Sequence, residues 1–183
     1  TFTRLIDLGV NPKILTSAVS LAIAQRLVRR LCKHCKQAHT LTQEEQQLLR
    51  KHYDLISEPE VDFTTEVFVP KEGGCEECNK SGYKGRIGIF EAIQSDKIIE
   101  EALETNPSER EIKEVARAQG IMDMAQDGAT KILKGYTSIE EVMRVVDLKT
   151  GQGLGDAPTS WDSDVKKNPY GVEDDFDLGS LGE

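Results

Sequence analysis

The sequence predicts a mixed α/β fold with a small tetracysteine zinc subdomain, a C-terminal helical bundle and a disordered acidic tail. Three observations support this fold class. The four cysteines form two C-x-x-C pairs, amphipathic segments with helix-capping residues follow one another over residues 95–148, and the composition changes after residue 148. At 183 residues, the chain is long enough for one modest core or two small ones.

The four cysteines are the strongest chemical signal. Cys32 and Cys35 form one pair, and Cys75 and Cys78 form the other. Each C-x-x-C turn places two sulfurs on one side of a tight loop, so two turns supply the four thiolates of a closed tetrahedral zinc site. The long gap between the pairs predicts that a folded segment lies between them, with the metal joining its ends.

Other interpretations of the cysteines remain open. An even number of cysteines also permits disulfides or free thiols, although a reducing compartment, which we expect here, disfavours disulfides. A redox C-x-x-C needs one motif at a strand–helix junction rather than two matched pairs. His34 and His39 are expected to be solvated loop residues, because four thiolates already complete the site.

Net charge is −9, from 23 basic and 32 acidic residues, and this argues against general nucleic-acid binding. No apolar run reaches the ~20 residues of a membrane-spanning helix, so no membrane span is expected. The chain opens within what reads as a helix and has no initiator methionine. We therefore expect it to be the C-terminal part of a longer protein.

The first 31 residues read as two short helices and an ambiguous segment. A helix over 1–8 should stop at Gly9, and a short buried helix over 12–20 should follow with Asn11 as its cap. Periodicity does not decide between helix and strand for residues 21–31. A basic cluster then leads into the first cysteine pair, where it either balances the thiolates or binds phosphate; it consists of Arg26, Arg29, Arg30, Lys33 and Lys36.

The segment between the cysteine pairs carries a helix signal. Thr42 and Glu45 form a predicted capping box for an exposed helix that ends near His52. An irregular acidic stretch over 53–66 and a short strand over 67–70 follow. After the second pair, Gly82 and Gly85 can adopt turn conformations that free N–H groups for the thiolates, and residues 85–94 alternate as a strand.

Residues 95–148 read as a compact bundle of short helices. Ser95 and Ser108 are predicted caps, Glu111 completes a capping box with Ser108, and a further helix spans 121–134. Gly128 within that helix predicts close packing. Thr137 and Glu140 are predicted to form a third capping box. Beyond residue 148, glycines and acidic runs predict a disordered tail, in which isolated aromatic residues are either solvated or docking anchors.

Several stretches together resemble one family. "RLIDLGVNP", "AQRLVRRLC-x-x-C", "GC-x-x-C-x-x-x-GYKGRIGIFE" and "T-x-x-EEVMRV" are similar, in order over residues 1–148, to the C-terminal end of the secretion ATPases of type II secretion and type IV pilus assembly. The tetracysteine segment resembles that of the assembly and secretion branches, whereas retraction ATPases generally lack it.

The resemblance implies a hexameric, cytoplasmic, RecA-like motor at the inner membrane, which acts with a membrane platform protein. It implies the end of the motor domain at 1–31, the zinc subdomain at 32–94, a helical subdomain at 95–148 and an unmatched tail at 149–183. It also favours a strand over 22–30. Gln25 and Arg26 become candidates for residues near the nucleotide in the intact hexamer.

One family feature is missing. No G-x-x-x-x-G-K-[ST] phosphate-binding loop occurs in the chain, so we expect no ATP hydrolysis by this chain alone, and ATP and Mg²⁺ only in a full-length parent. The leading hypothesis is therefore the C-terminal part of an assembly or secretion ATPase with a structural zinc ion. The segment between the cysteine pairs would project as an outward arm. The alternative is a stand-alone zinc-stapled adapter without ATPase activity.

Overall fold

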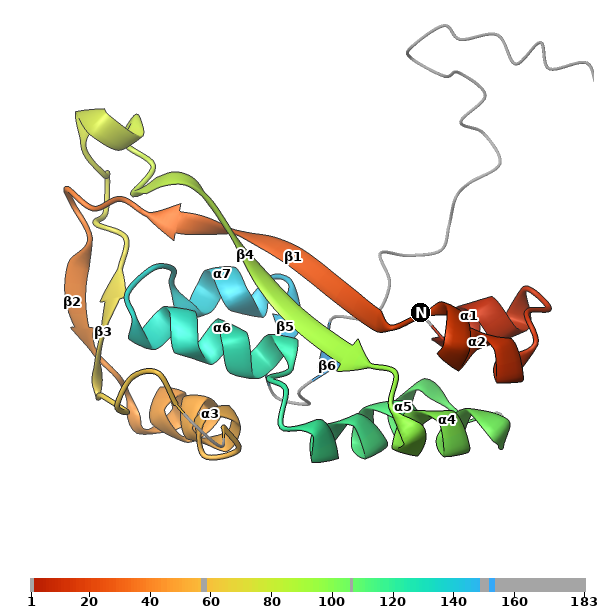
Figure 1. Ribbon diagram of the computed structural model, residues 1–183. Coiled ribbons are helices and arrows are strands. Elements are labelled where there is room, and N and C mark those ends of the chain that lie inside the picture. Colours follow the sequence, from red (N-terminus) through yellow and green to blue (C-terminus); the bar gives the residue numbers. More distant parts are fainter. Residues whose placement is uncertain (1, 57–58, 106, 149–151, 154–183) are drawn as a thin grey trace, which may run out of the picture.

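The computed structural model describes residues 2–56, 59–105, 107–148 and 152–153 (Figure 1). Within those residues, no helix is long and apolar enough to cross a membrane. The elements in order are α1 (Phe2–Asp7), α2 (Pro12–Ala18), β1 (Leu21–Leu31), β2 (Gln37–Thr40), α3 (Gln43–Tyr53), β3 (Glu66–Val69), η1 (Glu76–Cys78), β4 (Tyr83–Gln94), α4 (Lys97–Glu104), α5 (Glu109–Ala116), η2 (Arg117–Gln119), α6 (Met124–Leu133), α7 (Ile139–Met143), β5 (Val146–Asp147) and β6 (Gln152–Gly153).

A long antiparallel ribbon of β1 and β4 crosses the molecule (Figure 1). The pairing runs from Leu21 opposite Gln94 to Arg29 opposite Arg86, and the register shifts between Arg29 and Leu31. The strand that the family resemblance favours over 22–30 is thus present. Periodicity could not identify it because only Val28 and Leu31 of β1 are fully buried, so the strand lacks a regular buried face.

The main hydrophobic cluster lies between the ribbon, helices α6 and α7, and the segment that separates the cysteine pairs. Val28 and Ile89 of the ribbon contribute to it, together with Leu41, Leu49 and Val67 from that segment. In this segment β2 and β3 pair antiparallel, and α3, which lies between them in the chain, packs against α6 (Figure 1). The predicted outward arm is therefore wrong: its apolar residues are buried against the C-terminal helices.

A second hydrophobic cluster lies at the other end of the ribbon. Phe2 of α1 packs there with Ile99 and Leu103 of α4 and Ile112 of α5. The C-terminal helices are thus divided between two clusters, α4 and α5 in the second and α6 and α7 in the main one, instead of forming a single bundle. The helix predicted as buried over 12–20 is largely exposed instead: of the α2 residues whose burial is described, only Leu15 is buried, and Ile14 is 55% exposed.

The helix caps follow the sequence closely, with three corrections. The capping boxes of α3, from Thr42 and Glu45, and of α5, from Ser108 and Glu111, are confirmed. Helix α4 is capped by Asp96 instead of Ser95. Helix α6 begins at Met124 instead of residue 121, because Asp123 and Gln126 form a capping box there.

The third correction concerns α7, whose cap is Ser138 instead of Thr137. Thr137 instead donates its hydroxyl to the carbonyl of Arg29 in β1. At the end of the chain, the two residues of β6 pair with β5. The rest of the predicted disordered tail, 149–151 and 154–183, lies outside the described residues.

Candidate metal centre

The four cysteines come together at the end of the β1–β4 ribbon. Their sulfur atoms all lie within 4.8 Å of one another, and the close pairs are Cys32–Cys75 at 3.8 Å, Cys35–Cys78 at 3.8 Å and Cys75–Cys78 at 3.7 Å. Sulfurs placed about 2.3 Å from a tetrahedral zinc ion are about 3.8 Å apart. The four thiols are free, and the sulfurs are much farther apart than the ~2.0 Å of a disulfide bond. The donor set and its spacing therefore fit a metal ion.

The two C-x-x-C turns, called knuckles below, produce this arrangement. In the first, the backbone N–H groups of Cys35 and Lys36 donate to the carbonyl of Cys32 at 3.3 and 3.0 Å. In the second, η1 ends in Asn79 and Lys80, both with left-handed backbone conformations. The N–H of Cys32 donates to the carbonyl of Gly82 at 2.9 Å, which ties the two knuckles together directly.

The four thiols differ in their surroundings, and the pKa values of Cys78 and Cys35 are shifted in opposite directions. The backbone N–H groups of Cys75 and Gly82 each donate to Cys78 Sγ at 3.2 Å, and the pKa of Cys78 is lowered to about 6. Burial raises the pKa of Cys35 to about 12. Because a metal ligand must be a thiolate, the buried Cys35 needs a cation nearby to ionise. The predicted role of Gly82 as a donor to the thiolates is confirmed, whereas Gly85 has a left-handed backbone conformation within β4.

Of the two histidines predicted to be solvated loop residues, only His34 is one, because His39 lies half-buried within strand β2. Among the residues that the structure describes, the group able to hold a metal consists of the four cysteines alone. His34 is exposed, and His39 Nε2 lies 3.2 Å from Glu45 Oε2. Neither histidine belongs to the cluster.

The basic cluster before the first knuckle is largely used in internal contacts. Arg29 forms an ion pair with Glu141 at 2.5 Å and stacks 4.2 Å above the ring of Tyr83. Arg30 lies over the ring of Tyr136, and Lys36 Nζ donates to the carbonyl of Gly135 and lies over Phe68. These contacts favour a structural role for the cluster over phosphate binding.

Comparison with known proteins shows the family to which the chain belongs. The sequence profile of the family described as "Type II/IV secretion system protein" matches residues 1–144. The chain belongs to this family. It is 40% identical over 148 residues to the type IV pilus assembly ATPase TfpB of Acinetobacter baylyi, an alignment that covers 81% of the chain and 24% of the relative.

Relatives from the pilus assembly branch and the secretion branch have comparable sequence identity to the chain. The type II secretion system protein E of Aeromonas hydrophila is 37% identical over 78% of the chain and 26% of its own length. The type IV pilus assembly ATPase PilB of Thermus thermophilus is 38% identical over 77% of the chain and 15% of its own length. The chain thus spans about a quarter or less of the curated relatives that it matches.

Within this family member, Gln25 and Arg26 lie in the middle of β1, opposite Phe90 and Ile89 of β4. Both side chains are exposed, and neither belongs to the cysteine cluster, which lies beyond the end of the same strand. Their placement near a nucleotide stays a prediction. Sequence reasoning missed Glu141, whose carboxylate joins α7 to β1 across 112 positions, because no local pattern connects residues so far apart.

Proposed function

We propose that this chain is the C-terminal part of a hexameric ATPase that powers type IV pilus assembly or type II protein secretion. The observation that carries the proposal is the family match over residues 1–144, in which the four cysteines occupy one cluster. Relatives in both branches are named as an assembly ATPase or a secretion protein E. The parent acts in the cytoplasm at the inner membrane, with an integral membrane platform protein as its partner.

ATP hydrolysis in this proposal depends on parts of the protein outside the chain. The sequence has no G-x-x-x-x-G-K-[ST] loop, so the residues that hold ATP and Mg²⁺ come from elsewhere in the parent. Residues 1–31 complete the RecA-like motor domain, with Gln25 and Arg26 as the candidates for residues near the nucleotide in the intact hexamer. Residues 32–94 form the zinc subdomain and 95–148 the helical subdomain.

Zinc is the metal that the four thiolates suit best, because tetrahedral four-sulfur sites are typical of structural zinc. Cys32, Cys35, Cys75 and Cys78 would hold it, and four protein ligands leave no position for water or substrate. The ion would supply positive charge that balances the buried thiolates and join β1 to β4 at their shared end. Its role is structural, not catalytic.

A chimaera tests the motor assignment. Residues 1–148 would replace the matching quarter of TfpB of Acinetobacter baylyi or of secretion protein E of Aeromonas hydrophila, and ATP hydrolysis would be measured with pilus assembly or secretion. We expect hydrolysis in both chimaeras and restored export in the branch to which the chain belongs. Hydrolysis by the 183-residue chain itself, abolished by a mutation within residues 1–148, would contradict the proposal.

Metal analysis tests the zinc assignment independently. The purified chain should contain one equivalent of zinc, and its four thiols should react with a thiol reagent only after a chelator is added. A chain that folds without metal and takes up no zinc when zinc is added, or one with two disulfides, would refute the site. A chain that binds zinc and the platform protein, but cannot support hydrolysis in either chimaera, would favour the stand-alone adapter.

A further inference from the structure

The segment Gly135–Glu141, at the turn into α7, contacts the residues that flank the first knuckle and the start of β4, which follows the second knuckle. The carbonyl of Tyr136 accepts from the N–H of Leu31 at 2.9 Å, directly before Cys32. The carbonyl of Gly135 accepts from Lys36 Nζ at 3.0 Å, directly after Cys35. The first C-x-x-C turn is thus held by this segment on both of its flanks.

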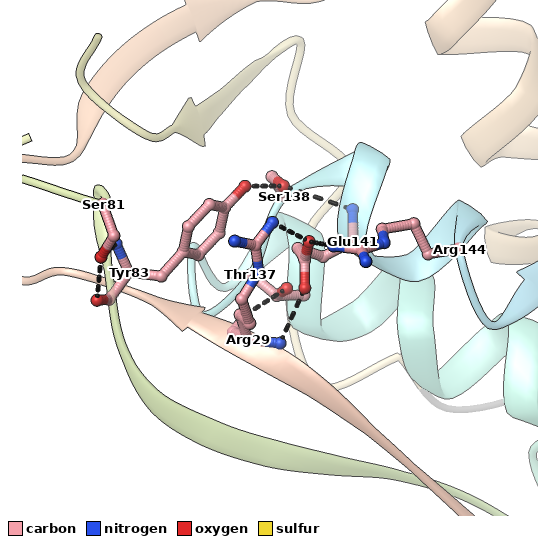
Figure 2. Close-up of polar contacts among 7 residues, drawn as sticks. All are labelled: Arg29, Ser81, Tyr83, Thr137, Ser138, Glu141 and Arg144. Carbon is pink, nitrogen blue, oxygen red and sulfur yellow. Dashed lines mark hydrogen bonds and ion pairs between the residues drawn. The ribbon is translucent and has the colours of Figure 1, made fainter. Parts of the chain in front are cut away.

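The same segment also holds the chain where it leaves the second knuckle. Ser138 Oγ and Tyr83 Oη are joined by a hydrogen bond of 2.9 Å, and Ser81 Oγ in the preceding turn donates to the carbonyl of Tyr83 (Figure 2). Ser81 Oγ also lies 2.6 Å from the carbonyl of Cys78. Tyr83 is buried, as is Ser138. The strand that follows Cys78 therefore has a fixed anchor on the α7 turn.

Glu141 is the centre of this arrangement. Its Oε2 accepts from the backbone N–H of Arg29 at 3.0 Å, and its Oε1 accepts from the guanidinium groups of Arg29 and Arg144 (Figure 2). Its side chain is only 5% exposed. A buried carboxylate with two guanidinium donors on Oε1 and a backbone N–H donor on Oε2 is held in one geometry, and it fixes β1 three residues before Cys32.

We propose that the Gly135–Glu141 segment positions the two knuckles for metal binding, with Glu141 as the principal positioning residue. The inference rests on the zinc site proposed above. Without the segment, the cysteines would depend only on the ribbon and on each other for their spacing. Groups beyond the ligands that fix ligand orientation typically contribute about 10–100-fold to metal affinity.

The test is the rate at which the zinc-loaded 183-residue chain transfers its metal to a chelating dye at neutral pH. Glu141→Gln keeps the side-chain shape but loses the charge and one acceptor oxygen, and we expect release about tenfold faster or more. Tyr83→Phe removes only the hydroxyl that bonds Ser138 and should accelerate release by a smaller factor. It keeps the inference testable if the Glu141 variant does not fold.

Two control variants separate positioning from general destabilisation. Glu140→Gln makes the same substitution on the neighbouring exposed residue and should release zinc like the wild type. Leu103→Ala creates a cavity in the second hydrophobic cluster, far along the ribbon, and should lower stability without faster release. With Co²⁺ in place of zinc, the Glu141 and Tyr83 variants should also change the visible spectrum of the tetrahedral site, whereas the two controls should not.

If the Gly135–Glu141 segment affects zinc binding, zinc binding must also affect the segment. Removal of zinc should increase deuterium uptake in residues 135–143 and leave α4 unchanged. If Glu141→Gln and Tyr83→Phe retain zinc as the wild type does, the inference is wrong while the zinc site stands. If the wild type binds neither zinc nor Co²⁺, both the site and the inference fail.

Discussion

The backbone of Gly128 in α6 lies directly against the side chain of Val142 in α7. A Cβ added to Gly128 would come within 2.7 Å of Val142 Cγ1, closer than real Cβ atoms approach a neighbour. Val142 is fully buried in the main cluster and cannot turn toward solvent. The close packing predicted for Gly128 is thus confirmed, and it sets the separation of the two helices.

Gly128→Ala should therefore destabilise the protein. Alanine gains about 1 kcal/mol of helix propensity over glycine, but overpacking in a filled core costs about 1–3 kcal/mol. We expect a net loss of roughly 1 kcal/mol in the free energy of unfolding, measured by urea denaturation. Combined with Val142→Ala, the loss should be smaller than the sum of the two single losses. A Gly128→Ala protein more stable than the wild type would contradict this packing.

The ionised carboxylate of Glu141 should make part of the free energy of unfolding depend on pH in the acid range. Burial by itself raises the pKa of this carboxyl, but hydrogen bonds from Arg29 and Arg144 outweigh it and lower the pKa to about 2. Because the folded pKa lies below the unfolded value of about 4.3, ionised Glu141 stabilises the fold fully above about pH 5, and this contribution disappears as the pH falls toward 2.

The difference in unfolding free energy between wild type and Glu141→Gln should follow that pH dependence. It should reach at most about 3 kcal/mol at neutral pH, and it should shrink steadily below about pH 5. Urea titrations at several pH values measure it, with Glu140→Gln as the control. A difference that stays constant down to pH 2.5 would show that the charge of Glu141 is not what stabilises the fold.

Leu49→Ala tests whether the segment between the knuckles packs onto the C-terminal helices. Leu49 in α3 is 0% exposed and belongs to the main cluster, so its truncation should cost about 2–5 kcal/mol. Leu55, which is 63% exposed, provides the same substitution outside the core and should change stability by less than about 0.5 kcal/mol. Equal effects of the two substitutions on thermal or urea unfolding would contradict the observed packing.

Gly82→Ala and Gly85→Ala form a matched pair beside the metal centre. Both glycines have left-handed backbone conformations, so both substitutions introduce similar backbone strain. Only at Gly82 would the new Cβ meet a neighbour, Pro70 Cβ at 2.6 Å, and only the Gly82 N–H donates to Cys78 Sγ. Gly82→Ala should therefore lose about 1–3 kcal/mol more stability than Gly85→Ala and release zinc faster. Identical zinc retention in both would argue against the role of the Gly82 N–H.

Local chemistry predicted the helix starts best. A hydroxyl residue followed three positions later by glutamate marked α3 and α5 correctly, because both groups of the capping box lie within one turn. The start of α6 was available from a wider form of this rule, since Asp123 and Gln126 have the same spacing with a carboxylate cap and an amide in place of the hydroxyl and the glutamate. At α7 the rule selected Thr137 and Glu140, one residue too early, because Thr137 bonds β1 and the next glutamate pairs with Arg29.

The cysteine cluster was predictable because two matched C-x-x-C turns already specify most of its geometry. The packing of the segment between them was not. It depends on Leu41, Leu49 and Val67 meeting α6, and no periodicity in two short strands and one helix identifies that distant surface. The division of the C-terminal helices between two clusters is equally non-local, because the second cluster includes Phe2 from the start of the chain.

The position of the cysteines at the closed end of the β1–β4 ribbon also bears on how fast the chain folds. The strands are far apart in sequence, and Cys32 and Cys75 are separated by 43 positions. Bringing the ends of such a loop together costs about 3 kcal/mol of chain entropy beyond a constant. A metal ion that joins the two knuckles in the unfolded chain has already closed this loop, so the strands can pair from the knuckles outward. Refolding should therefore be faster with zinc present, and most of the acceleration should come from ribbon formation.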